Sequence, residues 1–194
     1  MAEDLSFWRR LSTYAASEDP LTHATNKLAL VLASNQPFYP LYFWWATGER
    51  SWIPALTFIS TPFFLASPLV ARRFPDIGRL YFPFVGAINT FFCAFIFGVP
   101  SGVELFLAPC LVIAAFSCRA KERLALGVFL VALLGAFVLL HGHYGSPLYT
   151  TTPDKYEALL SLNGYSAAIL CVIAAWMYSA AWSDYEKQDS SVRR

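Results

Sequence analysis

The sequence predicts an all-α integral membrane protein, a bundle of six transmembrane helices with a short amphipathic helix at the N-terminus and both termini in the cytoplasm. Composition is the first observation behind this fold class: 57% of the 194 residues are hydrophobic and 14% are charged, against about 25% charged in an ordinary globular domain. The second is the presence of six apolar stretches close to the length of a membrane-crossing helix, about 17–25 residues. These stretches are residues 27–47, 52–71, 80–98, 103–118, 124–143 and 158–183.

The third observation is the alternation of basic residues between the connections. Of the 14 Lys and Arg residues, only Arg50 and Lys155 lie in the first, third or fifth connection. The others lie near the N-terminus, in the second and fourth connections, or after the last stretch. Because an excess of Lys and Arg in short loops marks the cytoplasmic side, this alternation predicts six spans with both ends of the chain inside.

Residues 1–24 are expected to form a cytoplasmic segment. Within residues 5–16, apolar and aromatic side chains share one helical face beside Arg9 and Arg10, namely Leu5, Phe7, Trp8 and Leu11 or Tyr14. This spacing is typical of a short amphipathic helix lying on the cytoplasmic leaflet. The alternative is an unstructured start in which the aromatic residues fall by chance.

Prolines interrupt the first two stretches. The first stretch, which Thr22 or Thr25 is expected to cap, contains Asn35-Gln36-Pro37 and Pro40 near its middle. Because proline lacks a backbone donor and clashes with the preceding turn, a kink or break is predicted there. The second stretch contains three prolines and is expected to be irregular: Pro54, Pro62 and Pro68.

The later stretches are predicted to be more regular. The third has Pro83 in its first turn, where proline is tolerated, and a tight outer turn at residues 98–102 leads into the fourth. The fifth is the most regular, and an outer loop at residues 144–155 follows it. The predicted domains are therefore a transmembrane domain at residues 25–183 and a cytoplasmic tail at residues 184–194, into which the last helix could extend.

Polar residues at membrane depth are the candidate ligand-binding residues, because such groups usually face the bundle interior and need partners. The predicted orientation places nearly all of them at the midplane or in the outer half of the bundle. We therefore expect an outward-facing pocket for a small apolar or amphipathic ligand. Its candidate residues are Asn35, Gln36, Tyr39, Asn89, Thr90, Glu104, His141 and Asn163.

Each of these candidates has a structural alternative. Asn, Gln and Thr in membrane helices often serve only as hydrogen-bonding groups between helices. Glu104, expected at the start of the fourth helix, could interact with the positive end of the helix dipole. His141 and His143 diverge on a continuous helix, so they could share a metal ion only if the helix ended there. Two histidines alone make a poor metal site, and no metal or other cofactor is expected.

Enzymatic activity is not expected either. A glycine-rich phosphate loop, an HExxH or GxSxG motif and a pair of carboxylates are all missing from the sequence. The formal net charge of +1 gives no indication of nucleic acid binding. The four cysteines all fall inside predicted spans, where we expect small buried apolar residues.

Several features of the chain together resemble a known family. They are the segment Glu18-Asp19-Pro20-Leu21, the aromatic run from Phe38 to Trp45, the compact spacing of six spans, and a sixth helix that runs into the charged stretch from Tyr178 to Lys187. This layout resembles the six-helix membrane sensors that precede bacterial signalling domains, in particular the receptor region of CqsS-type quorum-sensing histidine kinases and similar regions of class III adenylate cyclases.

The resemblance implies a receptor in the bacterial inner membrane, surrounded by membrane lipid. Its small lipophilic ligand would bind among the helices, and the last helix would carry the signal within a homodimer or to a separate membrane or signalling partner. These 194 residues contain no kinase or cyclase domain. A stand-alone relative, a partner of a separate protein and a piece of a longer chain all stay open.

Two other function classes stay open from the sequence. A structural or accessory subunit of a larger membrane complex would also be small, aromatic-rich and without catalytic motifs. A small-molecule permease is less favoured, because it would need a continuous polar path, and the inner halves of these helices are almost purely apolar.

Overall fold

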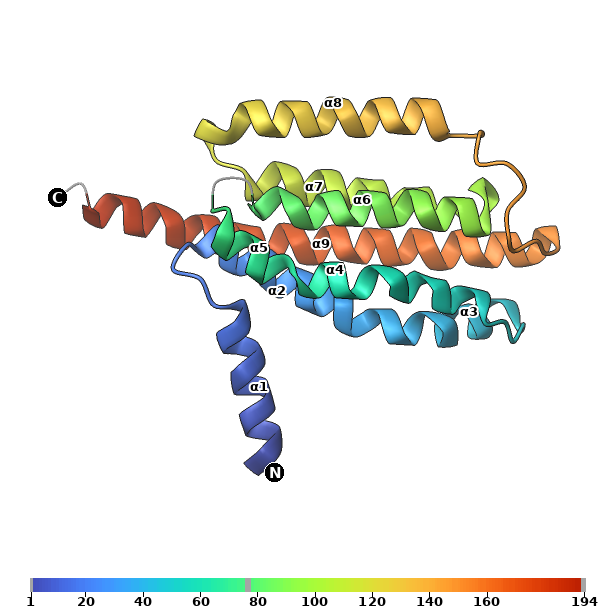
Figure 1. Cartoon of the computed structure of the whole chain (residues 1–194), viewed down its shortest axis with the longest axis horizontal. Helices are drawn as coiled ribbons and strands as arrows, with labels where there is room; N and C mark the ends of the chain where they lie inside the picture. The colour runs from blue at the N-terminus through green and yellow to red at the C-terminus, as the bar shows by residue number, and fades with distance from the viewer. Residues whose placement is uncertain (1, 76–77, 193–194) are drawn as a thin grey trace.

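The computed structural model describes residues 2–75 and 78–192, and within these residues the chain is helical and forms no β-strand (Figure 1). The α-helices are α1 Ala2–Ala15, α2 Pro20–Asn35, α3 Tyr39–Thr47, α4 Thr61–Leu65, α5 Ser67–Arg73, α6 Gly78–Phe97, α7 Leu107–Ser117, α8 Arg123–Leu140 and α9 Pro153–Val192. Short 3-10 helices lie between several of them: η1 Gln36–Phe38, η2 Ile53–Ser60, η3 Val99–Ser101, η4 Val103–Phe106 and η5 Ala120–Glu122.

Four helical segments in the described part of the chain are long and apolar enough to cross a membrane: Ile53–Arg73, Gly78–Phe97, Ala120–Leu140 and Pro153–Gln188. They coincide with the second, third, fifth and sixth apolar stretches. Four helices of this length and composition indicate a membrane protein. The fourth stretch forms a shorter apolar helix, Val103–Ser117, below the roughly 17–25 residues of a typical span. The first stretch carries Asn35, Gln36 and many interfacial aromatic residues, which lower its hydropathy. Spans at these two stretches stay a prediction.

The first two stretches are broken where their prolines predict it. The first consists of α2, the 3-10 turn η1 with Pro37, and α3, which begins at Tyr39. The second consists of η2, α4 and α5, each with a proline in its first turn. The predicted cap of the first stretch is wrong: Asp19 caps α2 and accepts the backbone N–H of Thr22, because Pro20 fixes the first helical position.

Pro83 lies inside α6, and not in its first turn as predicted, because the helix begins earlier, at Gly78. Gly78 makes the early start possible. A Cβ atom at this position would lie 2.5 Å from the Cα of Ala71, so only glycine lets α5 and α6 approach this closely. The tight contact makes α5 and α6 a helical hairpin.

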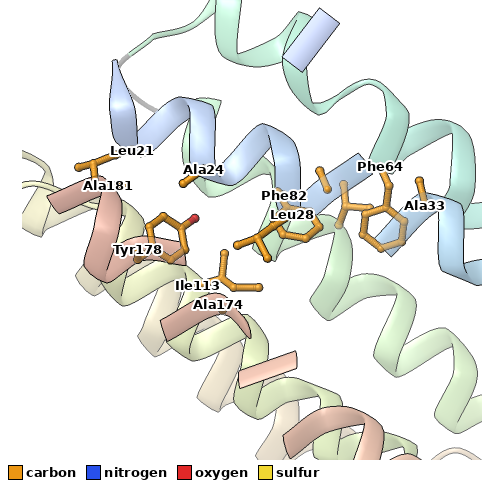
Figure 2. Packing of buried hydrophobic residues seen from close by; sticks show 12 residues of the cluster. Leu21, Ala24, Leu28, Ala33, Phe64, Phe82, Ile113, Ala174, Tyr178 and Ala181 are labelled. Carbon is orange, nitrogen blue, oxygen red and sulfur yellow. The ribbon is translucent and has the colours of Figure 1, made fainter. Parts of the chain in front are cut away.

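Helix α9 runs the length of the bundle beside α2 and α7 (Figure 1). A buried cluster packs α9 against α2, α4, α6 and α7, and Figure 2 shows Leu28, Phe82 and Ile113 meeting near Tyr178 of α9. A second cluster, around Phe43, Phe97 and Tyr149, fills the other half of the bundle. Burial of these large side chains supplies the main packing energy, at roughly 25 cal/mol per Å² of apolar area.

Helix α8 lies along the edge of the bundle (Figure 1). Leu133 is the one residue of α8 with a buried side chain among those described, while Leu124 is 82% exposed and Leu139 is 74% exposed. Leu133 packs with Ala87, Leu107 and Cys110 in a small cluster. A helix that is apolar on all sides and packs by one narrow strip is suited to a lipid environment.

The two ends of the chain are both helical. Helix α1 points away from the bundle (Figure 1), and the Tyr14 hydroxyl donates to the backbone oxygen of Leu65 at 2.6 Å. The side chains of residues 1–8, which include Leu5, Phe7 and Trp8, lie outside the described residues, so the amphipathic face of α1 stays a prediction. At the other end, α9 continues without interruption through the predicted tail to Val192.

Candidate functional site

Polar side chains gather at the two ends of the bundle. At the end that we call the Glu104 end, η3, η4, the 141–152 loop and the start of α9 meet. At the opposite end, which we call the Arg79 end, the starts of α2 and α6 meet η5 and the last third of α9. At the Glu104 end two of these polar side chains line a cavity, and at the Arg79 end they form a closed ionic network.

The cavity at the Glu104 end has a volume of about 500 Å³ and lies between α7, α8 and α9. Its walls are mostly aliphatic and include Leu105, Leu111, Leu134 and Leu160. Two ionisable side chains, Glu104 and His141, also line it. We call it the Glu104 cavity. An apolar pocket with a few polar groups at one place is the usual form of a small-molecule site.

Glu104 is the centre of the polar group in this cavity. Its side chain is 10% exposed, and one carboxylate oxygen lies 2.8 Å from Nδ1 of His141. The other oxygen accepts the Tyr144 hydroxyl at 2.7 Å. Burial, together with this hydrogen bond, raises the pKa of Tyr144, so the phenol stays a neutral donor at physiological pH.

The end of α8 places His141 beside Glu104. The helix ends at Leu140, and Gly142 follows with φ +75°, a left-handed conformation that favours glycine. His141 thereby turns toward η4, whereas the Nδ1 of His143 lies 3.0 Å from the backbone oxygen of His141. Among the described residues no group of three His, Cys, Asp or Glu side chains is arranged to hold a metal ion.

The other six predicted site residues do not line the Glu104 cavity. Gln36 is buried and donates to the Ser60 hydroxyl at 2.6 Å, while its oxygen accepts the Thr61 hydroxyl at 2.6 Å. It thus ties the first stretch to the second, which is the hydrogen-bonding alternative considered for it. Asn35 is exposed, and its side-chain oxygen accepts the Tyr42 hydroxyl at 3.3 Å.

The remaining four candidates make contacts within α6, or between α9 and its neighbours α3 and η3. Asn163 is fully buried and donates to the backbone oxygen of Ser101 at 2.8 Å, while Tyr39 donates to Asn163 at 3.4 Å. Thr90 donates to the backbone oxygen of Gly86 on its own helix, and Asn89 accepts the Cys93 thiol at 3.9 Å. Of the eight predicted residues, the structure therefore brings together two pairs, Glu104 with His141 and Tyr39 with Asn163. Of these pairs, Glu104 and His141 line the cavity.

A second carboxylate lies at the same end of the bundle but outside the cavity. Glu49 accepts the Tyr149 hydroxyl at 2.5 Å and pairs with Lys155. These contacts join the end of α3 to the 141–152 loop and to the first turn of α9. The hydrogen bond from Lys155 holds the pKa of Glu49 below its ordinary value. Glu49 is therefore a natural comparison for Glu104.

The sequence did not single out the ionic network at the Arg79 end. Arg79, at the start of α6, is 3% exposed; its Nη1 donates to Asp19 at 2.6 Å and its Nη2 to Glu122. Its Nε donates to the backbone oxygen of Ser117 at 2.8 Å. Its Nη1 also donates to the Thr22 hydroxyl at 3.2 Å. A buried guanidinium with four partners is fully satisfied, and two carboxylates neutralise it.

Arg119 extends this network toward α9. It pairs with Asp19 and stacks its guanidinium 4.6 Å from the ring centre of Tyr185. Burial works to raise the pKa of Asp19, but hydrogen bonds from Thr22 and the charges of Arg79 and Arg119 outweigh it and hold the pKa below its ordinary value. One sequence signal was available: Asp19 directly precedes a proline at a helix start, the position of an N-cap.

Helix α9 connects the two ends. Leu160 lines the Glu104 cavity, and farther along the helix the Tyr178 hydroxyl lies 2.7 Å from Oγ1 of Thr25. Trp182 then donates its indole N–H to the backbone oxygen of Phe116 at 2.9 Å, one turn before Tyr185. Helix α9 therefore contributes both to the wall of the cavity and to contacts at the Arg79 end.

Comparisons of the chain with protein-family models, with curated proteins and with solved structures give no match. The features of the chain that bear on function are therefore the cavity, the ionic network and the helix between them.

Proposed function

We propose that this protein is a membrane sensor. A small apolar or amphipathic ligand binds in the Glu104 cavity, in the outer half of a bundle of six transmembrane helices, and α9 reports the bound state to the cytoplasmic side. The observation that carries this proposal is the Glu104 cavity itself: an aliphatic pocket with an ionisable pair at one end and α9 as one of its walls.

The proposed orientation places the Glu104 end outside and the Arg79 end, with both termini, in the cytoplasm of a bacterium, as the resemblance to bacterial sensors implies. It is supported by the positive charges. Arg50 and Lys155 belong to connections at the Glu104 end, whereas Arg72, Arg79 and Arg119 belong to the opposite end.

Orientation is tested by labelling single cysteines with a membrane-impermeant maleimide in intact cells. Ser146→Cys, in the exposed 141–152 loop, should react without permeabilisation, and Ser190→Cys, at the end of α9, should react only after it. The reverse pattern would contradict the proposed topology.

The shape of the cavity supports an amphipathic ligand. A volume of about 500 Å³ lies within the range of about 300–1,000 Å³ typical of small-molecule sites. The leucine side chains would contact the apolar part of the ligand. Its polar part would lie beside Glu104 and His141, where a carboxylate can accept and an imidazole can donate or accept a hydrogen bond.

The contacts of α9 support its role as the reporting element. A ligand that moves the helix near Leu160 would change the hydrogen bonds of Tyr178 and Trp182. Beyond them, Tyr185 touches the Arg119 guanidinium of the ionic network. The output would be read by a second copy of the chain or by a separate signalling partner.

The ligand site is tested by thermal unfolding of the purified protein with a panel of fatty ketones, quinones and sterols. A compound that raises the Tm of the wild type should lose this effect in Glu104→Gln and in Leu134→Trp, which fills the cavity. It should keep the effect in Glu49→Gln, the matched carboxylate outside the cavity. Equal stabilisation of all four proteins would contradict the site, and stable co-purification with a defined membrane complex would favour the accessory-subunit alternative.

A further inference from the structure

A second hollow lies at the other end of α8, between this helix and the α5–α6 hairpin. It has a volume of about 540 Å³, and its walls include Phe74, Tyr81 and Phe84 on one side and Leu124, Val128 and Phe129 on the other. We call it the Phe74 groove. It belongs to the Arg79 end, so it is separate from the Glu104 cavity.

The Phe74 groove is apolar and open to the surroundings of the protein. Phe84 is 51% exposed and Val128 is 62% exposed, so the groove is accessible along the faces of both helices. From Gly78 to Phe84 it follows α6 for about 9 Å. An open apolar groove between two membrane helices is suited to a hydrocarbon chain that arrives from the bilayer.

Basic side chains lie where the walls of the groove begin. Arg73 directly precedes Phe74, and its guanidinium lies 5.4 Å from the ring centre of that wall residue. Arg123, exposed at the first position of α8, directly precedes the wall residue Leu124. Both positions belong to the end of the bundle where helical segments long and apolar enough to cross a membrane begin or end.

These two arginines differ from Arg79 and Arg119, which lie at the same end. Arg79 and Arg119 are neutralised by Asp19 and Glu122 within the ionic network. No carboxylate among the described residues pairs with Arg73 or Arg123. Within the described part of the chain, both guanidinium groups thus keep a positive charge that can attract an anion.

We propose that the Phe74 groove binds an anionic phospholipid of the phosphatidylglycerol type. One acyl chain lies against Phe74, Phe84 and Val128, and the phosphate is held by Arg73 and Arg123. Arginine suits this role because its planar guanidinium donates two parallel hydrogen bonds to a phosphate. Basic pockets between membrane helices on the cytoplasmic side are known to bind anionic headgroups.

The bound lipid would also hold α8 in place. Near the groove, Leu124 and Val128 of α8 are largely exposed, and Leu133, farther along, is the buried residue among those described in this helix. An acyl chain between α6 and α8 would supply the missing contacts. The proposed lipid site does not depend on ligand binding in the Glu104 cavity. The lipid proposal can therefore be contradicted without affecting the sensor proposal, and the reverse also holds.

The test is native mass spectrometry of the delipidated protein with dioleoyl phosphatidylglycerol and, separately, dioleoyl phosphatidylcholine. The wild type should retain phosphatidylglycerol in preference to phosphatidylcholine. Replacing Arg73 or Arg123 by glutamine should weaken phosphatidylglycerol binding about fivefold for each arginine, since one basic residue near the surface is worth about 1 kcal/mol.

Two further variants complete the design. Arg50→Gln is the matched control, because Arg50 stacks 4.7 Å from the Trp44 ring centre at the Glu104 end; it should bind phosphatidylglycerol like the wild type. Ala125→Phe adds bulk on the wall of the groove and should reduce retention of the lipid without altering a charge. Equal retention of both lipids by the wild type, or equal loss in Arg50→Gln and Arg73→Gln, would overturn the proposal.

Discussion

The guanidinium of Arg119 lies 4.6 Å from the ring centre of Tyr185, at the point where α9 leaves the bundle. Arg119 also pairs with Asp19, which in turn pairs with the buried Arg79. The last helix is therefore attached to the same ionic network that joins the starts of α2 and α6. This attachment is a physical link between the bundle and the part of α9 that extends from it.

Removing the Tyr185 ring should loosen the end of α9. A partly exposed cation–π contact contributes about 0.5–1 kcal/mol, which corresponds to a roughly two- to fivefold change in a local opening equilibrium. Tyr185→Ala should accordingly speed amide hydrogen exchange after Tyr185 by that factor. Tyr185→Phe keeps the ring and should exchange like the wild type; equal exchange in all three proteins would contradict the attachment.

Replacing Arg79 should destabilise the fold strongly. In Arg79→Gln, Glu122 and Asp19 lose their buried partner, and breaking a buried pair costs about 3–5 kcal/mol. Chemical unfolding in detergent measures the loss. The control is Lys187→Gln, which removes an exposed pair with Asp184 and should change the free energy of unfolding by at most about 0.5 kcal/mol. Similar values for the two variants would show that the network does not stabilise the fold.

Low pH should destabilise the Arg79 end of the fold because Asp19 becomes protonated. Its pKa is lowered in the folded state, so its stabilising effect is full above the unfolded pKa of about 3.9 and is lost as the pH falls through the lower folded value. As the pH falls, the Tm of Asp19→Asn should decrease less steeply than the Tm of the wild type. Asparagine is used because it remains a good helix cap. Asp154→Asn, at the exposed start of α9, should keep the wild-type slope; parallel curves for all three proteins would exclude the effect.

Gln36 should matter for stability and not for ligand binding. Its amide bonds to Ser60 and Thr61 across two helices, and such interhelical bonds contribute about 0.6–1.7 kcal/mol. Gln36→Leu should lower the free energy of unfolding by this amount, whereas Asn35→Leu, at an exposed position, should leave it nearly unchanged. If Gln36→Leu instead abolished stabilisation by a compound that binds the wild type, Gln36 would belong to a ligand site.

The sequence predicted the helices well because hydropathy and proline act locally. The second, third, fifth and sixth stretches became the four long apolar helices, and the break at Gln36 followed from Pro37. The start of α6 was missed because it depends on the close approach of Gly78 to Ala71. That contact is tertiary, and no local sequence pattern predicts it.

The sequence predicted some residues of the candidate site, but it did not predict where in the fold they meet. Glu104 and His141 were both candidates, yet their meeting depends on where α8 ends and on the left-handed turn at Gly142. The Arg79 network escaped prediction because Asp19 and Glu122 lie far from Arg79 in the chain. In the sequence, Arg79 was only one of the basic residues of a predicted connection, and Asp19 was noted only as part of the segment Glu18-Asp19-Pro20-Leu21.

The most direct test of the sensor account follows the end of α9 while a ligand binds. An environment-sensitive dye on Ser190→Cys would report it, with a compound that raises the Tm of the wild type as the ligand. The dye signal should change on binding in the wild-type background and in Glu49→Gln, and it should not change in Leu134→Trp, whose cavity is filled. A compound that binds the Glu104 cavity without any change at residue 190, or a change that persists in Leu134→Trp, would contradict the account.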